Sequence, residues 1–193
     1  MDFTLQPLTK EGAKLVSLAE EHVPALAHRA DEHDRAASFP FQNFEEMRES
    51  GLLRACVPIE LGGLGVDSAH DVAVAMSRLA QGDGATALGA NMHLTQVWLL
   101  TRFWKSVRDA GEKESADRLE GFLRRLASGQ ILISSTVAEA GTDILHPHLQ
   151  AVEAPGGWIL NGRKSFGTLT PAAQLLQVTC RVTGKDGQAR FAV

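Results

Sequence analysis

The hydrophobic pattern of the sequence changes at Gly129, and this change constrains the fold more than any other feature. Before it, apolar residues recur at the three- and four-residue spacing of a buried helix face. After it, short apolar and β-branched runs are separated by turns that contain glycine or proline. We therefore predict an α+β fold, with an all-α helical domain over residues 1–128 followed by an incomplete β-barrel or sandwich domain over residues 129–193.

The first part of the chain predicts a series of helices, over 10–33, 43–53, 68–79, 83–104 and 112–127. Pro24 lies within the first range and is expected to kink or interrupt it, because proline removes a backbone donor and clashes with the preceding turn. Ser68 and Asp83 are expected to cap the third and fourth helices, since short polar side chains accept hydrogen bonds from free N–H groups at a helix start.

Six β-type runs follow, over 131–137, 149–153, 158–160, 165–168, 175–182 and 189–193, with turns at 155–157, 161–162 and 184–187. Asn161-Gly162 favours the positive φ angles of a type I′ turn, so the third and fourth runs are expected to form a β-hairpin. Alternate residues of a strand share a face, so Phe166 and Thr168 would present an aromatic ring beside a hydroxyl. Such a pair suits a planar heteroaromatic ligand.

Composition excludes several classes of function. The 193 residues are 44% hydrophobic and 22% charged, as in a soluble globular protein, and the net charge of -4 gives no reason to expect nucleic acid as a partner. No apolar stretch approaches the roughly 20 residues that span a bilayer, and the start of the sequence lacks the pattern of a secretory signal. Cys56 and Cys180 have no metal-ligand spacing, so we expect a reduced, cytoplasmic protein.

Four motifs follow one another along the chain, at 58–65, 83–93, 138–143 and 161–168. In this order they resemble the Pro-x-x-x-Gly-Gly-Leu-Gly loop, the Asp-x-Ser-x-Ala…His helix, the FAD-binding loop and the flavin-side hairpin of the acyl-CoA dehydrogenase family. The resemblance covers residues 40–182 and is specific because the four segments agree in order. The third motif is two positions shorter than the family pattern.

The resemblance implies bound FAD and an acyl-CoA or related thioester as substrate. Thr168 would form a hydrogen bond near flavin N5 or O4, and Phe166 would take the place of the family's tryptophan against the ring. Ala138 stands where the family's flavin-binding threonine lies, and Thr136 is the neighbour best placed to supply a hydroxyl instead. Thr142 corresponds to the family serine that approaches the FAD pyrophosphate.

Simpler structural roles stay open for the same residues. Phe166 would otherwise be a core residue and Thr168 an ordinary strand residue. Thr142 would otherwise belong to a local turn in which Asp143 caps the following segment. His93 lies on the apolar face of its helix, where a lone histidine is expected to be a core residue with its hydrogen bonds satisfied.

Two further groups of polar residues attract no catalytic role. His146 and His148 flank a proline, but no third ligand lies near them in the sequence, so we expect no metal site. Glu139 and Asp143 are expected to structure their loop rather than to act as an acid and a base.

The family's C-terminal helical domain, which carries the glutamate base and further flavin contacts, has no counterpart in this sequence. We therefore assign no catalytic residue and interpret the chain as a fragment, as one of two complementary chains, or as a protein without the family chemistry. The expected function is flavin-dependent oxidation of the CH-CH bond of an acyl-CoA-type thioester, in a homo-oligomer or with a complementary C-terminal chain. A flavin-dependent monooxygenase of the same fold and a catalytically silent assembly subunit are the alternatives.

Overall fold

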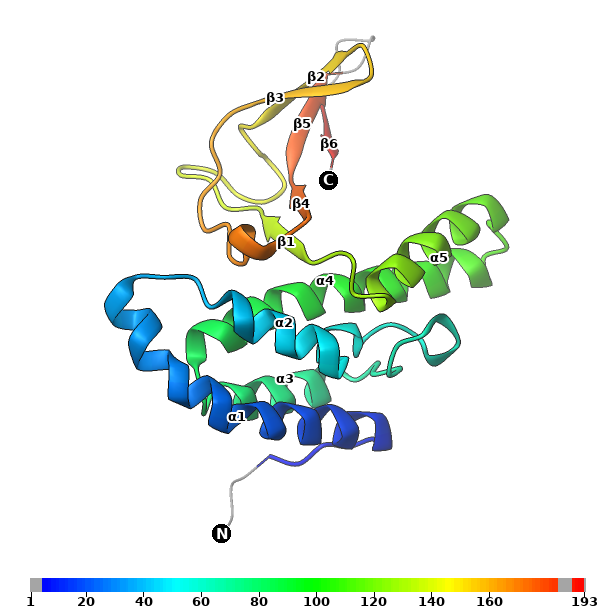
Figure 1. Ribbon diagram of the computed structural model, residues 1–193. Coiled ribbons are helices and arrows are strands. Elements are labelled where there is room, and N and C mark those ends of the chain that lie inside the picture. Colours follow the sequence, from blue (N-terminus) through cyan, green and yellow to red (C-terminus); the bar gives the residue numbers. More distant parts are fainter. Residues whose placement is uncertain (1–4, 184–188, 193) are drawn as a thin grey trace.

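The computed structural model describes residues 5–183 and 189–192, and its helices form a bundle, called the helical layer below, on which a smaller region of strands stands (Figure 1). The helices are α1 (Lys10–Ala36), α2 (Phe41–Ser50), α3 (Ala69–Leu79), α4 (Gly84–Asp109) and α5 (Lys113–Ala127). The strands are β1 (Ile133–Thr136), β2 (Gln150–Ala154), β3 (Gly157–Asn161), β4 (Leu175–Val178), β5 (Cys180–Thr183) and β6 (Ala189–Ala192). Short 3-10 helices are η1 (Leu52–Arg54), η2 (Ile59–Leu61) and η3 (Thr170–Ala172).

Side-chain caps define where the helices begin. Ser68 accepts a hydrogen bond from the Asp71 N–H at the start of α3, and Asp83 accepts from two N–H groups at the start of α4, which confirms both predicted caps. Of the two effects expected at Pro24, an interruption does not occur, because α1 continues past it to Ala36. The helix does change direction partway along its length (Figure 1). Leu15, Ala19 and Leu26 anchor α1 in the core on both sides of the proline.

The main hydrophobic core crosses the position where the sequence pattern changes. It joins buried residues of all five helices to Ile131, Leu132 and Ile133 at the start of the strand region, and to Leu169. The strands have a small cluster of their own, formed by Leu149, Ala151 and Cys180. β1 is therefore anchored to the helices, while the predicted domain boundary near residue 129 stays a prediction.

The strands form two small sheets, which confirms the expected α+β class with an incomplete β-region. β1 pairs with β4 in parallel, and the second sheet has the order β3-β2-β5-β6. The run predicted over 175–182 is divided between the two sheets as β4 and β5. The turn predicted over 184–187 and Val193 lie outside the described residues.

The hairpin predicted at Asn161-Gly162 is wrong. β3 instead pairs with the preceding strand β2 around the turn at Pro155-Gly156, and Asn161 is its last residue, opposite Gln150. Gly162 then packs so closely on Leu149 that a Cβ atom on it would lie 2.7 Å from the Leu149 Cα. The chain therefore leaves the sheet, and residues 165–168 form no strand beyond a single bridge between Ser165 and Ala138.

Within the described residues, every helix is too short or too polar to cross a lipid bilayer.

Candidate functional site

The segment 162–168, which connects β3 to η3, is fixed to β1 by side-chain hydroxyls. The Ser134 hydroxyl donates to the Thr168 carbonyl at 2.7 Å, and the Thr136 hydroxyl donates to the Ser165 carbonyl at 3.0 Å. The Ser165 N–H donates in turn to the Ala138 carbonyl at 2.9 Å. The structure thus brings Thr136 and Ala138 against this segment, and the Thr136 hydroxyl hydrogen is already donated within the protein.

Phe166 has a backbone conformation that bulky residues seldom adopt. Its φ angle is 57°, and its side chain is 84% exposed. A core role for Phe166 is therefore wrong. Positive φ at a bulky residue stores strain, and such strain gathers at functional sites. An aromatic ring held away from the core in this way offers a flat apolar surface to a ligand.

Thr168 lies two residues further on, with its backbone fully engaged. Its N–H donates to the Phe166 carbonyl at 2.9 Å, and its own carbonyl accepts the Ser134 hydroxyl. The Thr168 hydroxyl makes no hydrogen bond within the described part of the chain. Because the segment is a loop, the strand face predicted for Phe166 and Thr168 is wrong, but the aromatic ring and the free hydroxyl remain close in sequence on one anchored loop.

A buried ion pair holds the base of this loop. Lys164 Nζ lies 2.5 Å from the Glu139 carboxylate, and the two side chains are only 6% and 3% exposed. Lys164 also donates to the Thr179 hydroxyl at 2.8 Å and to the Val137 carbonyl at 3.3 Å. All three donors of the ammonium group are therefore used.

Glu139 is equally well satisfied, which bears out its expected role in structuring the loop. It accepts the His148 N–H at 2.6 Å and the Leu149 N–H at 3.1 Å. Burial alone would raise the pKa of the Glu139 carboxyl, but the hydrogen bonds from Lys164 and these two N–H groups outweigh it, so that the net pKa is lowered. Glu139 follows Ala138 and Lys164 precedes Ser165, so the pair fixes both sides of the Ala138–Ser165 bridge.

The loop 139–149 is closed by its own polar groups. The Thr142 hydroxyl donates to the His146 carbonyl at 2.5 Å, as in the local turn considered above. Asp143 accepts the Leu145 N–H at 2.8 Å and contacts His146 Nδ1 at 2.8 Å, and the hydrogen bond from His146 lowers the pKa of its carboxyl. A hollow of about 480 Å³ lies between this loop and the segment 162–168, lined by Glu139, Ala140, His148, Arg163 and Ser165.

His93 connects α4 to the start of β1. It is 1% exposed, and the Ile133 N–H donates to its Nδ1 at 3.0 Å. Its Nε2 lies 3.0 Å from the Leu53 carbonyl, an acceptor, so Nε2 carries the hydrogen and the ring is neutral. Burial lowers the pKa of His93 to about 4, opposed by the bond to Leu53. The expectation of a satisfied core histidine is confirmed.

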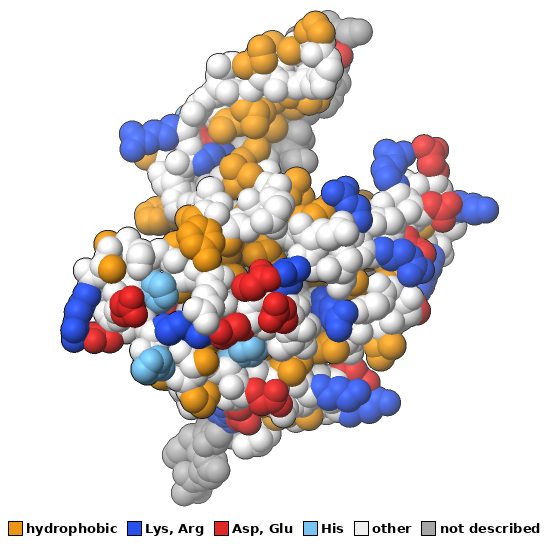
Figure 2. All heavy atoms as spheres, viewed as in Figure 1, with side chains coloured by type: hydrophobic (Ala, Val, Ile, Leu, Met, Phe, Trp, Pro, Cys, Tyr) orange, Lys and Arg blue, Asp and Glu red, His pale blue; other side chains and the backbone are white. Residues whose placement is uncertain are grey.

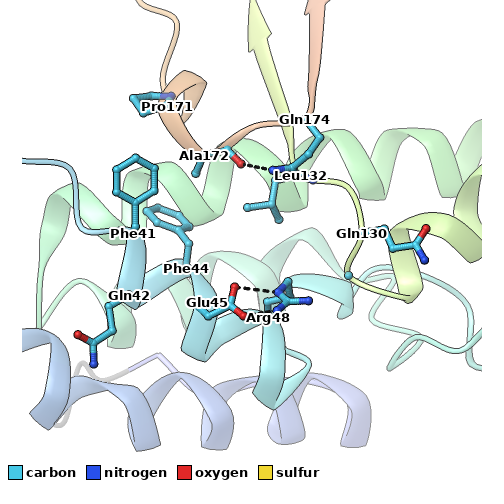
Figure 3. Close-up of a pocket in the computed structure, with 11 residues that line it drawn as sticks. Phe41, Gln42, Phe44, Glu45, Arg48, Gln130, Leu132, Pro171, Ala172 and Gln174 are labelled. Carbon is cyan, nitrogen blue, oxygen red and sulfur yellow. Dashed lines mark hydrogen bonds and ion pairs between the residues drawn. The ribbon is translucent and has the colours of Figure 1, made fainter.

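A groove of about 580 Å³ lies where α2 meets the strand region (Figure 3). Figure 3 shows Phe41, Pro171 and Ala172 over one part of it and the Arg48–Glu45 ion pair over another. Its walls come from α2, from the link after α5 and from η3, so no local motif in the sequence predicts it. Figure 2 shows apolar side chains at this junction and over the strands above it.

The anchoring roles of two residues could not be read from the sequence. Ser134 is a serine in a β-type run, and Lys164 belongs to the motif at 161–168, but neither position indicates which distant residue it contacts. Their partners, Thr168 and Glu139, lie 34 and 25 positions away in the chain, and only the folded structure joins them.

This arrangement, a helical domain followed by small and incomplete sheets, matches the acyl-CoA dehydrogenase fold. Butyryl-CoA dehydrogenase from Megasphaera elsdenii has the same fold, with a TM-score of 0.71 at 24% identity over 100% of this chain and 50% of that one. The family described as "Acyl-CoA dehydrogenase, N-terminal domain" matches residues 13–130. The chain belongs to the acyl-CoA dehydrogenase family.

More similar relatives lie in one branch of enzymes. The amino sugar nitrososynthase RubN8 of Streptomyces rubradiris is 34% identical over 93% of this chain and 41% of its own length. The structure of KijD3 in complex with FMN and dTDP-3-amino-2,3,6-trideoxy-4-keto-3-methyl-D-glucose has a TM-score of 0.83 at 33% identity, over 98% of this chain and 46% of that one. The chain thus spans less than half the length of these two relatives.

Proposed function

We propose that this chain is the flavin-facing N-terminal part of a flavin-dependent N-oxygenase, which oxidises the amino group of a nucleotide-linked amino sugar to a nitroso group. The observation that carries the proposal is the similarity to nitrososynthases across nearly the whole chain, the strand region included. This proposal corresponds to the monooxygenase alternative of the sequence analysis, and it replaces thioester oxidation as the favoured function.

The residues present suit a flavin. The Phe166 ring is exposed on an anchored loop and offers a surface on which an isoalloxazine ring would stack. The Thr168 hydroxyl would donate to a flavin acceptor, because its backbone partners are already satisfied and its hydroxyl has no partner among the described residues. The Thr136 oxygen, having donated its own hydrogen, would accept from a ring N–H.

The choice between FAD and FMN is part of the proposal. The sequence predicted FAD, with Thr142 near its pyrophosphate. The Thr142 hydroxyl hydrogen is donated to the His146 carbonyl, so a pyrophosphate contact at this residue would use its backbone N–H instead. Chromatography of the flavin that the denatured full-length protein releases distinguishes the two cofactors.

The proposed reaction balances with reduced flavin and dioxygen as the co-reactants. When bound, reduced flavin supplies electrons to dioxygen. Oxidation of one amine to a nitroso group consumes two dioxygen molecules and two reduced flavins, and releases two oxidised flavins and three waters. The chain's own residues would bind and orient the ring, and the proposal assigns none of them as a proton-transfer group.

Thioester CH-CH oxidation is the second candidate, favoured by the family match over residues 13–130. The test is to incubate the full-length protein with a flavin reductase, NADH and oxygen, together with either a dTDP-linked 3-amino sugar or butyryl-CoA. We expect the amino sugar to gain one oxygen and lose two hydrogens by mass spectrometry. An enoyl thioester from butyryl-CoA, with the amino sugar unchanged, would overturn the proposal.

We further propose that the protein works as a homo-oligomer. We also propose that it works in a reducing, cytoplasmic environment, which its free thiols would suit. Cys56 and Cys180 are buried free thiols, and burial raises the pKa of the Cys56 thiol to about 12. A thiol of this kind forms no thiolate near neutral pH and is inert. Light scattering of the full-length protein gives its assembly state, and a monomer would contradict this part of the proposal.

A further inference from the structure

α4 meets the proposed flavin loop, or the strand that holds it, at two places one helical turn apart. The first is Gly89, beside which Leu169 packs: a Cβ atom on Gly89 would lie 3.7 Å from Leu169 Cδ1, an ordinary contact distance, while the close approach of 2.7 Å would be to Phe44 Cζ. Leu169, directly after Thr168, is 3% exposed and belongs to the helical core. The loop end therefore rests on α4 itself.

The second place is His93, which acts on the loop through β1. Its Nδ1 accepts the N–H of Ile133, the first residue of β1. From β1, the Ser134 and Thr136 hydroxyls reach the Thr168 and Ser165 carbonyls. Every link in this route is a hydrogen bond of 3.0 Å or less between buried or half-buried groups.

The two ring nitrogens of His93 have separable duties. Nε2 donates to the Leu53 carbonyl and ties α4 to η1, within the helical layer. Nδ1 accepts from Ile133 and ties α4 to the strand that carries the loop. Without the bond to Nδ1, the buried Ile133 N–H has no hydrogen-bond partner. Because an unpaired buried donor is costly, we expect β1 to shift until this N–H finds another acceptor.

We infer that His93 is a positioning residue for the proposed flavin site, and that it acts through the bond from the Ile133 N–H to its Nδ1. The inference rests on the proposed flavin-dependent function. It assigns a role at the loop to a residue that lies in the helical core and does not touch the ligand.

Two substitutions of His93 separate positioning from general stability. In His93→Asn the side-chain oxygen occupies the place of Nδ1 and accepts from Ile133, while the bond to Leu53 is lost. In His93→Gln the amide nitrogen reaches the place of Nε2 and donates to Leu53, while the acceptor for Ile133 is lost. Each variant keeps one bond of the pair, so the helical core loses a similar amount of stability in both.

The experiment titrates FMN and FAD into the full-length wild type and both variants, and follows hydrogen exchange of the amides over 133–136. We expect His93→Gln to weaken flavin binding by about tenfold or more, with faster exchange in β1, and His93→Asn to stay within about threefold of wild type. Equal effects of the two variants on affinity and exchange would overturn the inference.

Two measurements keep the test decisive. If the wild type binds no flavin, the proposed function fails. Independently of flavin binding, an unchanged rate of amide hydrogen exchange over 133–136 in His93→Gln would overturn the positioning role of His93. If both variants fail to fold, nitrogen NMR of the wild-type imidazole decides, because the inference requires a neutral ring with its hydrogen on Nε2 at neutral pH. A hydrogen on Nδ1 would overturn it.

Discussion

Lys164 anchors the loop that we propose to face the flavin. Its ammonium group joins Thr179, 15 positions away in the chain, to Glu139 and to Val137, 27 positions away. A charge pair that is buried with every donor and acceptor satisfied contributes little net stability over an apolar pair, but removal of one partner is costly.

We therefore expect Lys164→Met to destabilise the chain by about 3 kcal/mol, because the Glu139 carboxylate would stay buried without its cation. Urea denaturation followed by circular dichroism measures the change. The matched control is Arg118→Met, which removes an exposed pair with Glu114 and should cost at most about 0.5 kcal/mol. Equal losses in the two variants would show that the Lys164 pair behaves as a surface pair.

His93 predicts a pH dependence of stability. Its folded pKa of about 4 lies below the unfolded value of 6.5, so the neutral ring favours folding. The stability is fully present above pH 6.5 and is lost as pH falls toward 4, at up to about 1.4 kcal/mol per pH unit. Arg48, Glu49 and Arg54 line the hollow beside the ring, but burial is the main cause of the shift.

The measurement is urea denaturation of wild type and His93→Asn at pH 6.5 and at pH 5. Both values lie in the range from the unfolded pKa of 6.5 down to the folded pKa of about 4, where the stability is expected to fall. The wild type should lose about 2 kcal/mol more than the variant across this interval. Parallel losses would mean that another group controls the acid sensitivity.

The loop between η2 and α3 depends on a glycine for a steric reason. A Cβ atom on Gly63 would lie 2.0 Å from the Val57 carbonyl oxygen, a backbone atom that cannot turn aside. Gly121, on the exposed face of α5, has nothing within 4 Å of the same position. The two glycines therefore provide a matched pair.

We expect Gly63→Ala to cost about 2 kcal/mol or more and Gly121→Ala to add about 0.5–1 kcal/mol, since alanine is the better helix former where there is room. Thermal denaturation of both variants checks the signs. A tolerated Gly63→Ala would show that the loop shifts easily, and would weaken the link between this motif and the fold.

Local signals in the sequence were sufficient to predict where α3 and α4 begin, but not to predict the course of the loop 162–168. Ser68 and Asp83 marked helix starts correctly, because a cap is satisfied within three residues of itself. The hairpin failed because two turns, at Pro155-Gly156 and Asn161-Gly162, compete for the same strand. The choice depends on long-range contacts, namely β2 with β5 and Lys164 with Glu139.

The candidate site was predicted in part for the same reason. Phe166 and Thr168 were identified from their motif, and Thr136 and Ala138 do lie against the loop that carries them. The positive φ angle of Phe166 could not be predicted, since a bulky residue seldom adopts it, and the anchoring by Ser134 could not be predicted because Ser134 and Thr168 lie 34 positions apart.

The strand region exposes a run of apolar side chains on β3. Trp158, Ile159 and Leu160 of β3 are each about half exposed, at 54%, 56% and 49%. Exposed apolar residues grouped along one strand favour association with another surface. In Figure 2 apolar side chains gather over this upper part of the molecule.

We expect the 193-residue chain on its own to self-associate as its concentration rises, and Ile159→Lys to reduce that association, because a charge on β3 opposes burial of the strand. Analytical ultracentrifugation measures the effect. Leu8→Lys is the control, since Leu8 is 75% exposed near the start of α1. Equal behaviour of the two variants would exclude β3 as the contact.

The origin of the oxygen in the product tests the central claim most directly. The full-length protein is supplied with reduced flavin, a dTDP-linked 3-amino sugar and dioxygen of the heavy isotope, and the product is examined by mass spectrometry. An N-oxygenase places one heavy oxygen atom on the sugar nitrogen, and this is the result we predict. An oxidised product that carries no heavy oxygen, or an amine that is unchanged while flavin binds, would contradict the assignment of this chain to a flavin-dependent N-oxygenase.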